Sequence, residues 1–253
     1  MDLGLHGKRA IITGGTKGIG RKTAELLATE GCKVGFCARN QSQVEDTVNA
    51  LSKIGPKIIG GVTDVTDSQQ CRNWIAQTGD ALGGIDILIA NASALGASAD
   101  EEAWRSGLEV DILGTVRAVE AAMPYLLKSN AASIVGISST VAVNTPGGVR
   151  AYNGLKAALI NYLSGLSTNL GADGIRANAV SPGAVYFKGG VWDTRKKEAP
   201  EVYAATLARS PLGRFCTPEE VANAVVFLAS PAASFISGTN IIVDGGSTSR
   251  VQY

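Results

Sequence analysis

The sequence predicts an α/β fold in which a doubly wound parallel sheet of about seven strands carries helices on both faces. Strand-like and helix-like patterns alternate along the whole chain, which is typical of repeated strand–helix–strand units. Strand-like runs such as Ile85–Ala90 (IDILIA) are apolar toward both faces, as strands covered on two sides are. Right-handed crossovers between such strands then give the doubly wound arrangement.

The predicted elements follow one another in a regular order. Short aliphatic and β-branched runs predict strands at Arg9–Thr13, Lys33–Ala38, Lys57–Thr63, Ile85–Ala90, Ser133–Ser138, Arg176–Val180 and Asn240–Val243. The stretches between them predict helices at Gly18–Glu30, Gln43–Ile54, Asp67–Leu82, Glu102–Leu127, Ala151–Gly171 and Pro218–Ser230.

The segment Ser181–Ala199 breaks this order, because it is rich in glycines, aromatic residues and charges. Irregular segments of this length in a compact domain often serve as lids or mobile loops. The chain has no evident linker, charge block or internal repeat. Residues 1–253 are therefore predicted to form one domain, with a substrate lid around residues 184–210.

Composition and charge exclude several classes of function. The chain has 253 residues and a formal net charge of +1, so neither nucleic acid nor an anionic membrane is expected as a partner. It has no apolar stretch of the roughly 20 residues that span a membrane and no N-terminal export signal, which predicts a soluble, cytoplasmic protein. The four cysteines form no CxxC pair, and His6 is the only histidine, so no metal site and no serine–histidine triad is predicted.

A glycine-rich turn, Thr13–Gly20 (TGGTKGIG), directly follows the first predicted strand and opens the first predicted helix. Glycines at these positions let the backbone turn tightly and approach a pyrophosphate, which then meets the helix N-terminus. A glycine-rich turn alone is weak evidence. Its place between a strand and a helix predicts a dinucleotide-binding site.

The end of the second predicted strand indicates which dinucleotide is bound. Domains that bind NAD usually carry an acidic residue there, which holds the ribose 2′-hydroxyl. This sequence has Ala38 and Arg39 instead, and Lys17 lies inside the glycine-rich turn. Either cation alone is compatible with a solvated surface charge. Together, with no competing acid, they predict NADP(H), whose 2′-phosphate suits a guanidinium.

Tyr152 and Lys156 lie four residues apart at the start of a predicted helix, which places the phenol and the ammonium on one face. A free phenol titrates near about pH 10 and is a slow acid–base group at neutral pH, whereas a nearby positive charge favours the phenolate. The pattern alone arises easily by chance. Upstream, however, the strand Ile134–Ser138 and Ser139 place hydroxyls at the carboxyl edge of the sheet, where open α/β folds bind ligands.

The order of these motifs resembles the short-chain dehydrogenase/reductase family, in its single-domain branch, over nearly the whole chain. The resemblance rests on the turn Thr13–Gly20, Asp64-Val65, Asn91-Ala92, Ser139 with Tyr152 and Lys156, Ser181-Pro182-Gly183, and Val243–Gly246. It implies that a Rossmann-type domain binds NADP(H) through Gly14, Thr16, Lys17, Gly18, Ile19, Gly20, Arg39, Asp64, Val65, Asn91, Tyr152, Lys156, Pro182, Gly183 and Val185.

The resemblance also implies a mechanism. Tyr152 would donate a proton to the substrate oxygen as hydride reaches the carbonyl carbon. Lys156 would hold the nicotinamide ribose and favour the phenolate, and Ser139 would polarise the substrate oxygen. Ser138 is expected to face away, and Asn91 to brace the sheet beside the cofactor.

Three positions depart from the family pattern: Ser93 replaces a glycine, Phe187 a threonine, and Asp111 an asparagine. In relatives that asparagine holds a water that links the lysine to solvent, so Asp111 is included among the catalytic candidates. A carboxylate near Lys156 would stabilise the ammonium and oppose the phenolate of Tyr152. Alternatively, Asp111 simply replaces asparagine with a similar shape.

These observations predict an oxidoreductase that transfers hydride between NADP(H) and a small carbonyl or secondary alcohol, as a ketone reductase or a hydroxy dehydrogenase. The alternative is a catalytically idle NADP(H)-binding sensor or scaffold of the same fold, although such a protein would need neither Ser139 nor Tyr152. The expected pocket walls favour a partly apolar or aromatic substrate, and relatives suggest a homotetramer or homodimer. These walls are Leu95, Val141, Tyr186, Phe187 and Trp192.

Overall fold

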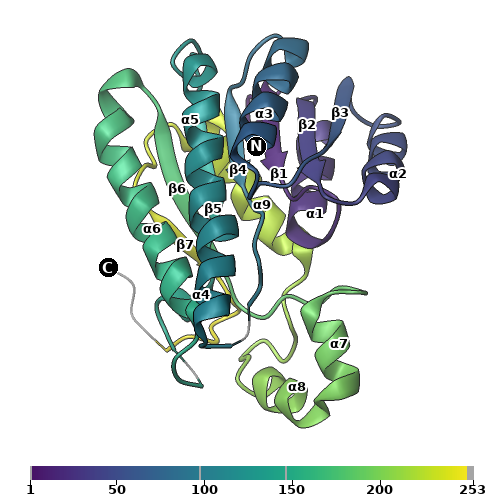
Figure 1. Ribbon diagram of the computed structural model, residues 1–253, viewed down its shortest axis with the longest axis vertical. Coiled ribbons are helices and arrows are strands. Elements are labelled where there is room, and N and C mark those ends of the chain that lie inside the picture. Colours follow the sequence, from purple (N-terminus) through teal and green to yellow (C-terminus); the bar gives the residue numbers. More distant parts are fainter. Residues whose placement is uncertain (1, 97, 146, 250–253) are drawn as a thin grey trace.

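Seven parallel strands form one sheet in the order β3-β2-β1-β4-β5-β6-β7 (Figure 1). The computed structural model describes residues 2–96, 98–145 and 147–249. The strands are β1 (Arg9–Thr13), β2 (Lys33–Ala38), β3 (Lys57–Val62), β4 (Ile87–Ala90), β5 (Ser133–Ile137), β6 (Arg176–Pro182) and β7 (Asn240–Val243). The predicted doubly wound α/β fold is thereby confirmed.

The strand order reverses between β1 and β4. Strands β2 and β3 are added in sequence on one side of β1. The chain then crosses back, so that β4 pairs with β1 on its other side, and β5, β6 and β7 follow in order beyond β4. The loops after β1 and β4 therefore leave the sheet in opposite directions, which opens a crevice at their carboxyl ends.

Helices cover both faces of the sheet. They are α1 (Gly18–Thr29), α2 (Gln41–Leu51), α3 (Ser68–Leu82), α4 (Glu101–Gly107), α5 (Gly114–Leu126), α6 (Ala151–Leu170), α7 (Val191–Glu198), α8 (Pro200–Leu207) and α9 (Pro218–Ala229). One apolar core joins the sheet to α1, α2 and α9, and a second joins its other face to α3, α5 and α6. Alternation along β1 shows the division: Ala10 and Ile12 belong to the first core and Ile11 to the second.

The long helix predicted over Glu102–Leu127 is interrupted by one π-helical segment, Leu108–Leu113, between α4 and α5. Such π segments are rare and often occur at functional sites. In this protein the π-helical turn includes Asp111.

The prediction of irregular structure over Ser181–Ala199 was wrong in part, because α7 begins at Val191 and α8 follows it directly. Both helices are short and bury no residue fully, so the sequence lacks the apolar spacing of a core helix. Together they form an excursion that stands below the carboxyl edge of the sheet in Figure 1. No helix in the described part of the chain is long and apolar enough to cross a bilayer.

Candidate active site

A cavity of about 1210 Å³ lies between the carboxyl edge of the sheet and the helices α7 and α8. Sites for one drug-sized ligand usually measure about 300–1,000 Å³, so this cavity has room for a dinucleotide and a second molecule. It is lined by every predicted site residue except Gly20 and Asp111, which lie behind its wall.

The glycine-rich turn forms one end of the cavity. Gly14 and Gly18 adopt φ angles of +72° and +51°, which side chains disfavour. A Cβ on Gly20 would collide with the carbonyl oxygen of Gly14 and the side chain of Asn91. The first helical residue of α1 is Gly18, and no side chain caps this end, so its first backbone N–H groups are available to an anion.

Asn91 ties this turn to the neighbouring strand. Its side-chain amide donates to the carbonyl oxygens of Thr13 (3.0 Å) and Gly14 (2.8 Å). The hydroxyl of Thr13 in turn accepts from the backbone N–H groups of Asn91 and Ala92, each at 3.1 Å. Hydrogen bonds therefore join the loop after β1 to the loop after β4 at this end of the cavity.

Lys17 and Arg39 both line this end of the cavity, and both are exposed. Cys37, which ends the buried part of β2, also lines it. Burial raises the pKa of the Cys37 thiol to about 12, so this group adds no negative charge at neutral pH. The two cations are thus free of a competing acid on the strand that leads to Arg39.

The other half of the cavity is built from the end of β5 and the first turn of α6. Tyr152 is half-buried on this turn, and Lys156 Nζ lies 5.5 Å from the centre of its ring. Ser139 follows β5, and its hydroxyl accepts a 3.4 Å hydrogen bond from the Val141 N–H. Ser138 also borders the cavity, but its hydroxyl is buried and donates to the carbonyl oxygen of Lys156 at 2.9 Å, which anchors α6 to β5.

Lys156 and Asp111 form a buried ion pair. Lys156 Nζ lies 2.8 Å from Asp111 Oδ1, and both side chains are only 2% exposed. The ammonium also donates to the carbonyl oxygen of Ile137 at 2.8 Å. Asp111 Oδ2 accepts from the Ala94 N–H at 2.9 Å, which fixes the loop after β4. Since an ammonium has three N–H groups, one remains for the cavity.

Two of the departures from the family pattern also have a structural role. The Ser93 hydroxyl accepts from the Leu95 N–H at 3.2 Å, and Leu95 holds a φ of +54° in the same short loop. The ring of Phe187 lies against the glycine-rich turn, because a Cβ on Gly18 would come within 2.8 Å of it. The segment between β6 and α7 therefore touches the end of the cavity formed by the glycine-rich turn.

The excursion that contains α7 and α8 is joined at its two ends by backbone hydrogen bonds. Val185 and Cys216 form a parallel bridge, in which Cys216 N–H donates to Ala184 and Tyr186 N–H donates to Cys216. The chain between these points, which includes α7 and α8, is packed by the rings of Tyr186, Trp192, Tyr203 and Phe215. The excursion thus returns to the body of the protein a few residues beyond the predicted limit of residue 210.

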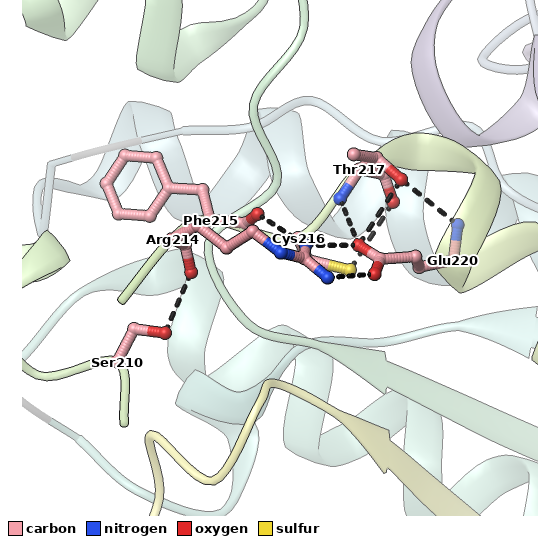
Figure 2. A network of polar contacts seen from close by, with 6 residues as sticks. All are labelled: Ser210, Arg214, Phe215, Cys216, Thr217 and Glu220. Atoms are coloured by element: carbon pink, nitrogen blue, oxygen red, sulfur yellow. Dashed lines mark hydrogen bonds and ion pairs between the residues drawn. The ribbon is translucent and has the colours of Figure 1, made fainter. Parts of the chain in front are cut away.

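Figure 2 shows the polar contacts that fix the chain between Ser210 and Glu220, where the excursion rejoins the body of the protein. The Arg214 guanidinium binds the Glu220 carboxylate at 2.5 and 2.8 Å, and Glu220 closes a capping box with Thr217 at the start of α9. Ser210 donates to the carbonyl oxygen of Arg214 at 2.7 Å. The Arg214 hydrogen bonds hold the pKa of Glu220 at about 2, so the pair stays ionised at physiological pH.

Sequence reasoning missed Arg150, which is half-buried, lines the cavity and directly precedes α6. The only signal was its position two residues before Tyr152. Sequence reasoning considered a carboxylate of Asp111 near Lys156, and the structure shows the two in direct contact as an ion pair. Within the described residues, no three histidine, cysteine or acidic side chains gather as ligands for a metal ion.

Comparison with known proteins assigns this site to a family. Residues 14–248 match the model of a family described as enoyl-(acyl carrier protein) reductase. Isoepoxydon dehydrogenase of Penicillium expansum is 41% identical over 252 residues, which cover 97% of this chain and 96% of that protein. The chain belongs to the short-chain dehydrogenase/reductase family. It is accordingly an oxidoreductase.

Two solved structures of this family share the whole architecture. L-sorbose reductase from Gluconobacter frateurii, in complex with NADPH and L-sorbose, is 30% identical and superposes with a TM-score of 0.91 over 99% of this chain and all of that one. An NADPH-bound short-chain oxidoreductase from Pseudomonas aeruginosa, which contains an atypical catalytic centre, is 31% identical with a TM-score of 0.90. That match covers 96% of this chain and 98% of the other.

The buried ion pair leads to a prediction about pH dependence. In Asp111→Asn the ammonium of Lys156 loses the carboxylate that neutralises it, so the phenolate of Tyr152 becomes more favourable. Alcohol oxidation should then rise with pH at lower pH values than in the native protein. The measurement is the pH–rate profile in the oxidative direction, with circular dichroism to verify that the variant is folded. An unchanged profile would leave Asp111 as a substitute for asparagine in shape only.

Proposed function

We propose that the protein is an NADP(H)-dependent oxidoreductase that interconverts a carbonyl compound and a secondary alcohol. The observation that carries this proposal is the convergence of Ser139, Tyr152 and Lys156 on one cavity with the glycine-rich turn. NADPH fits the residues present, because the uncapped start of α1 suits a pyrophosphate and the positions of Lys17 and Arg39 suit a 2′-phosphate. When bound, it supplies the hydride.

The protein's own residues handle the proton and the developing negative charge. Tyr152 gives its phenolic proton to the substrate oxygen, and the Ser139 hydroxyl donates a hydrogen bond to the same oxygen. Lys156 places its ammonium beside the phenol ring, and its remaining N–H is available to a ribose hydroxyl of the dinucleotide. The lid excludes water from the reacting groups.

The substitution Tyr152→Phe tests this assignment. It removes the proton donor and retains the ring, so turnover should fall by about 10²-fold or more. NADPH affinity should change little, which a fluorescence titration measures alongside the steady-state assay of NADPH absorbance. Turnover of the phenylalanine variant at the native rate would refute the role of Tyr152, and a native protein inactive on a broad panel of ketones and alcohols would favour the sensor alternative.

Cofactor choice has a separate test at Arg39. NADPH should bind at least about tenfold more tightly than NADH, which corresponds to about 1.4 kcal/mol. Arg39→Ala should reduce this margin mainly by weakening NADPH, because NADH has no 2′-phosphate for the guanidinium to bind. Titration of both cofactors against both proteins gives the four dissociation constants. Equal affinities in the native protein would contradict the assignment to NADP(H).

We also propose that the protein is cytoplasmic and forms a homotetramer or homodimer. Phe235 and Leu127 are exposed apolar side chains, and burying them against another copy of the chain would favour association. Gly154 of α6 lies against the ring of Trp104 of the same chain, so this position is not open to a partner helix. Light scattering at micromolar concentration measures the assembly, and a species of 26.0 kDa alone would contradict it.

A further inference from the structure

The cavity is strongly positive for a protein that is almost neutral overall. Seven lysine and arginine side chains line it, but only two carboxylates, those of Asp64 and Asp244. Both carboxylates are engaged by their own loops. Asp64 accepts from the N–H and the hydroxyl of Thr66, and Asp244 accepts from the N–H groups of Gly246 and Thr248. Neither forms an ion pair with a cation of the described cavity wall.

Four of the seven cations already have an assigned role. Lys17 and Arg39 lie at the dinucleotide end, Lys156 is paired with Asp111, and Arg214 is paired with Glu220 at the base of the lid. The other three are Arg150, Arg195 and Arg209, and among the described residues none of them has a carboxylate within ion-pair distance.

These three cations differ in how far they are withdrawn from solvent. Arg209 is exposed. Arg195 is half-buried on the lid, where its guanidinium lies 5.6 Å from the ring of Trp192. Arg150 is half-buried in the cavity wall itself, and its Nη2 lies beside Gly147, where an added Cβ would come within 3.3 Å.

Arg150 is placed where it can act on the molecule that Tyr152 protonates. It is the last residue before α6, with an extended backbone (φ −147°, ψ 142°), and only one residue separates it from Tyr152. Arg39 follows β2, and two strands, β1 and β4, separate β2 from β5 in the sheet. The start of α6, which Arg150 directly precedes, thus belongs to the other half of the site from the expected 2′-phosphate position. Withdrawing a charge from water without a partner is unfavourable, and a guanidinium matches a carboxylate with two parallel hydrogen bonds.

We propose that the substrate carries a carboxylate, which Arg150 binds while the carbonyl or alcohol group of the same molecule lies at Tyr152 and Ser139. This inference rests on the proposed oxidoreductase function and adds to it a substrate class, the hydroxy and oxo acids. Arg195 on the lid supplies further positive potential over the same space. The apolar side chains of Val141 and Leu95 are left to contact the body of the substrate.

The test compares oxo acids with their methyl esters, which keep the carbonyl and remove the charge. Suitable pairs are 4-oxopentanoate, 5-oxohexanoate and 4-oxocyclohexanecarboxylate with the corresponding esters. Binding is measured by calorimetry on the NADP⁺-loaded protein, where no hydride is available to the ketone, and turnover is measured with NADPH. At least one acid should bind at least tenfold more tightly than its ester, with a matching difference in kcat/KM that lies mainly in KM.

In Arg150→Gln this preference for the acid should fall at least tenfold. Arg72→Gln is the matched control, because Arg72 pairs with Glu120 on the surface and does not line the cavity; it should retain the native preference. Equal binding of acid and ester in every pair, or an unchanged preference in Arg150→Gln, overturns the proposal. So does a loss confined to NADPH affinity, which would assign Arg150 to the cofactor. Binding of the acid without any turnover of acids or esters would instead contradict the proposed function.

Discussion

A lysine ammonium buried at the carboxyl edge of the sheet is the constraint on which the rest of the site depends. Lys156 is 2% exposed, and an isolated charge at such a place is very costly. Two groups from different parts of the chain offset this cost, the carboxylate of Asp111 and the carbonyl oxygen of Ile137. The end of β5, the first two turns of α6 and the π-helical segment between α4 and α5 are therefore fixed around a single nitrogen atom.

This arrangement connects the two halves of the cavity. Asp111 uses its second oxygen to hold the Ala94 N–H, and the loop that contains Ala94 begins at Asn91, which braces the glycine-rich turn. A direct chain of contacts therefore runs from the proton-transfer side of the cavity to the dinucleotide side. The excursion that contains α7 and α8 adds a second connection, because Phe187 lies against Gly18 and the two ends of the excursion are joined by the Val185–Cys216 bridge.

The sequence predicted the fold and most of the cavity wall because these features have local signals. Strands apolar on both faces, such as β4, and the glycine-rich turn before α1 need no tertiary information. Helices α7 and α8 were missed because neither buries a residue fully. Their sequences therefore lack the apolar residues at every third or fourth position that mark a helix packed on a core. The π-helical segment was missed because the sequence around Asp111 reads as ordinary helix. Asp111 lies in this segment, so its contact with Lys156 could not be predicted without it. Arg150 has no sequence motif of its own and is recognised as a site residue only because it lines the cavity.

The most direct test of the buried pair is a double-mutant cycle on the free energy of unfolding, with Asp111→Asn, Lys156→Met and the double variant. Removing one partner of a buried ion pair leaves the other uncompensated, so each single variant should lose about 3–5 kcal/mol. The double variant should lose much less than the sum of the two, with a coupling energy of about 2 kcal/mol or more in urea unfolding at fixed protein concentration. Losses that add to within about 0.5 kcal/mol would show that the two side chains act independently, and would contradict the central role of this ion pair in the site.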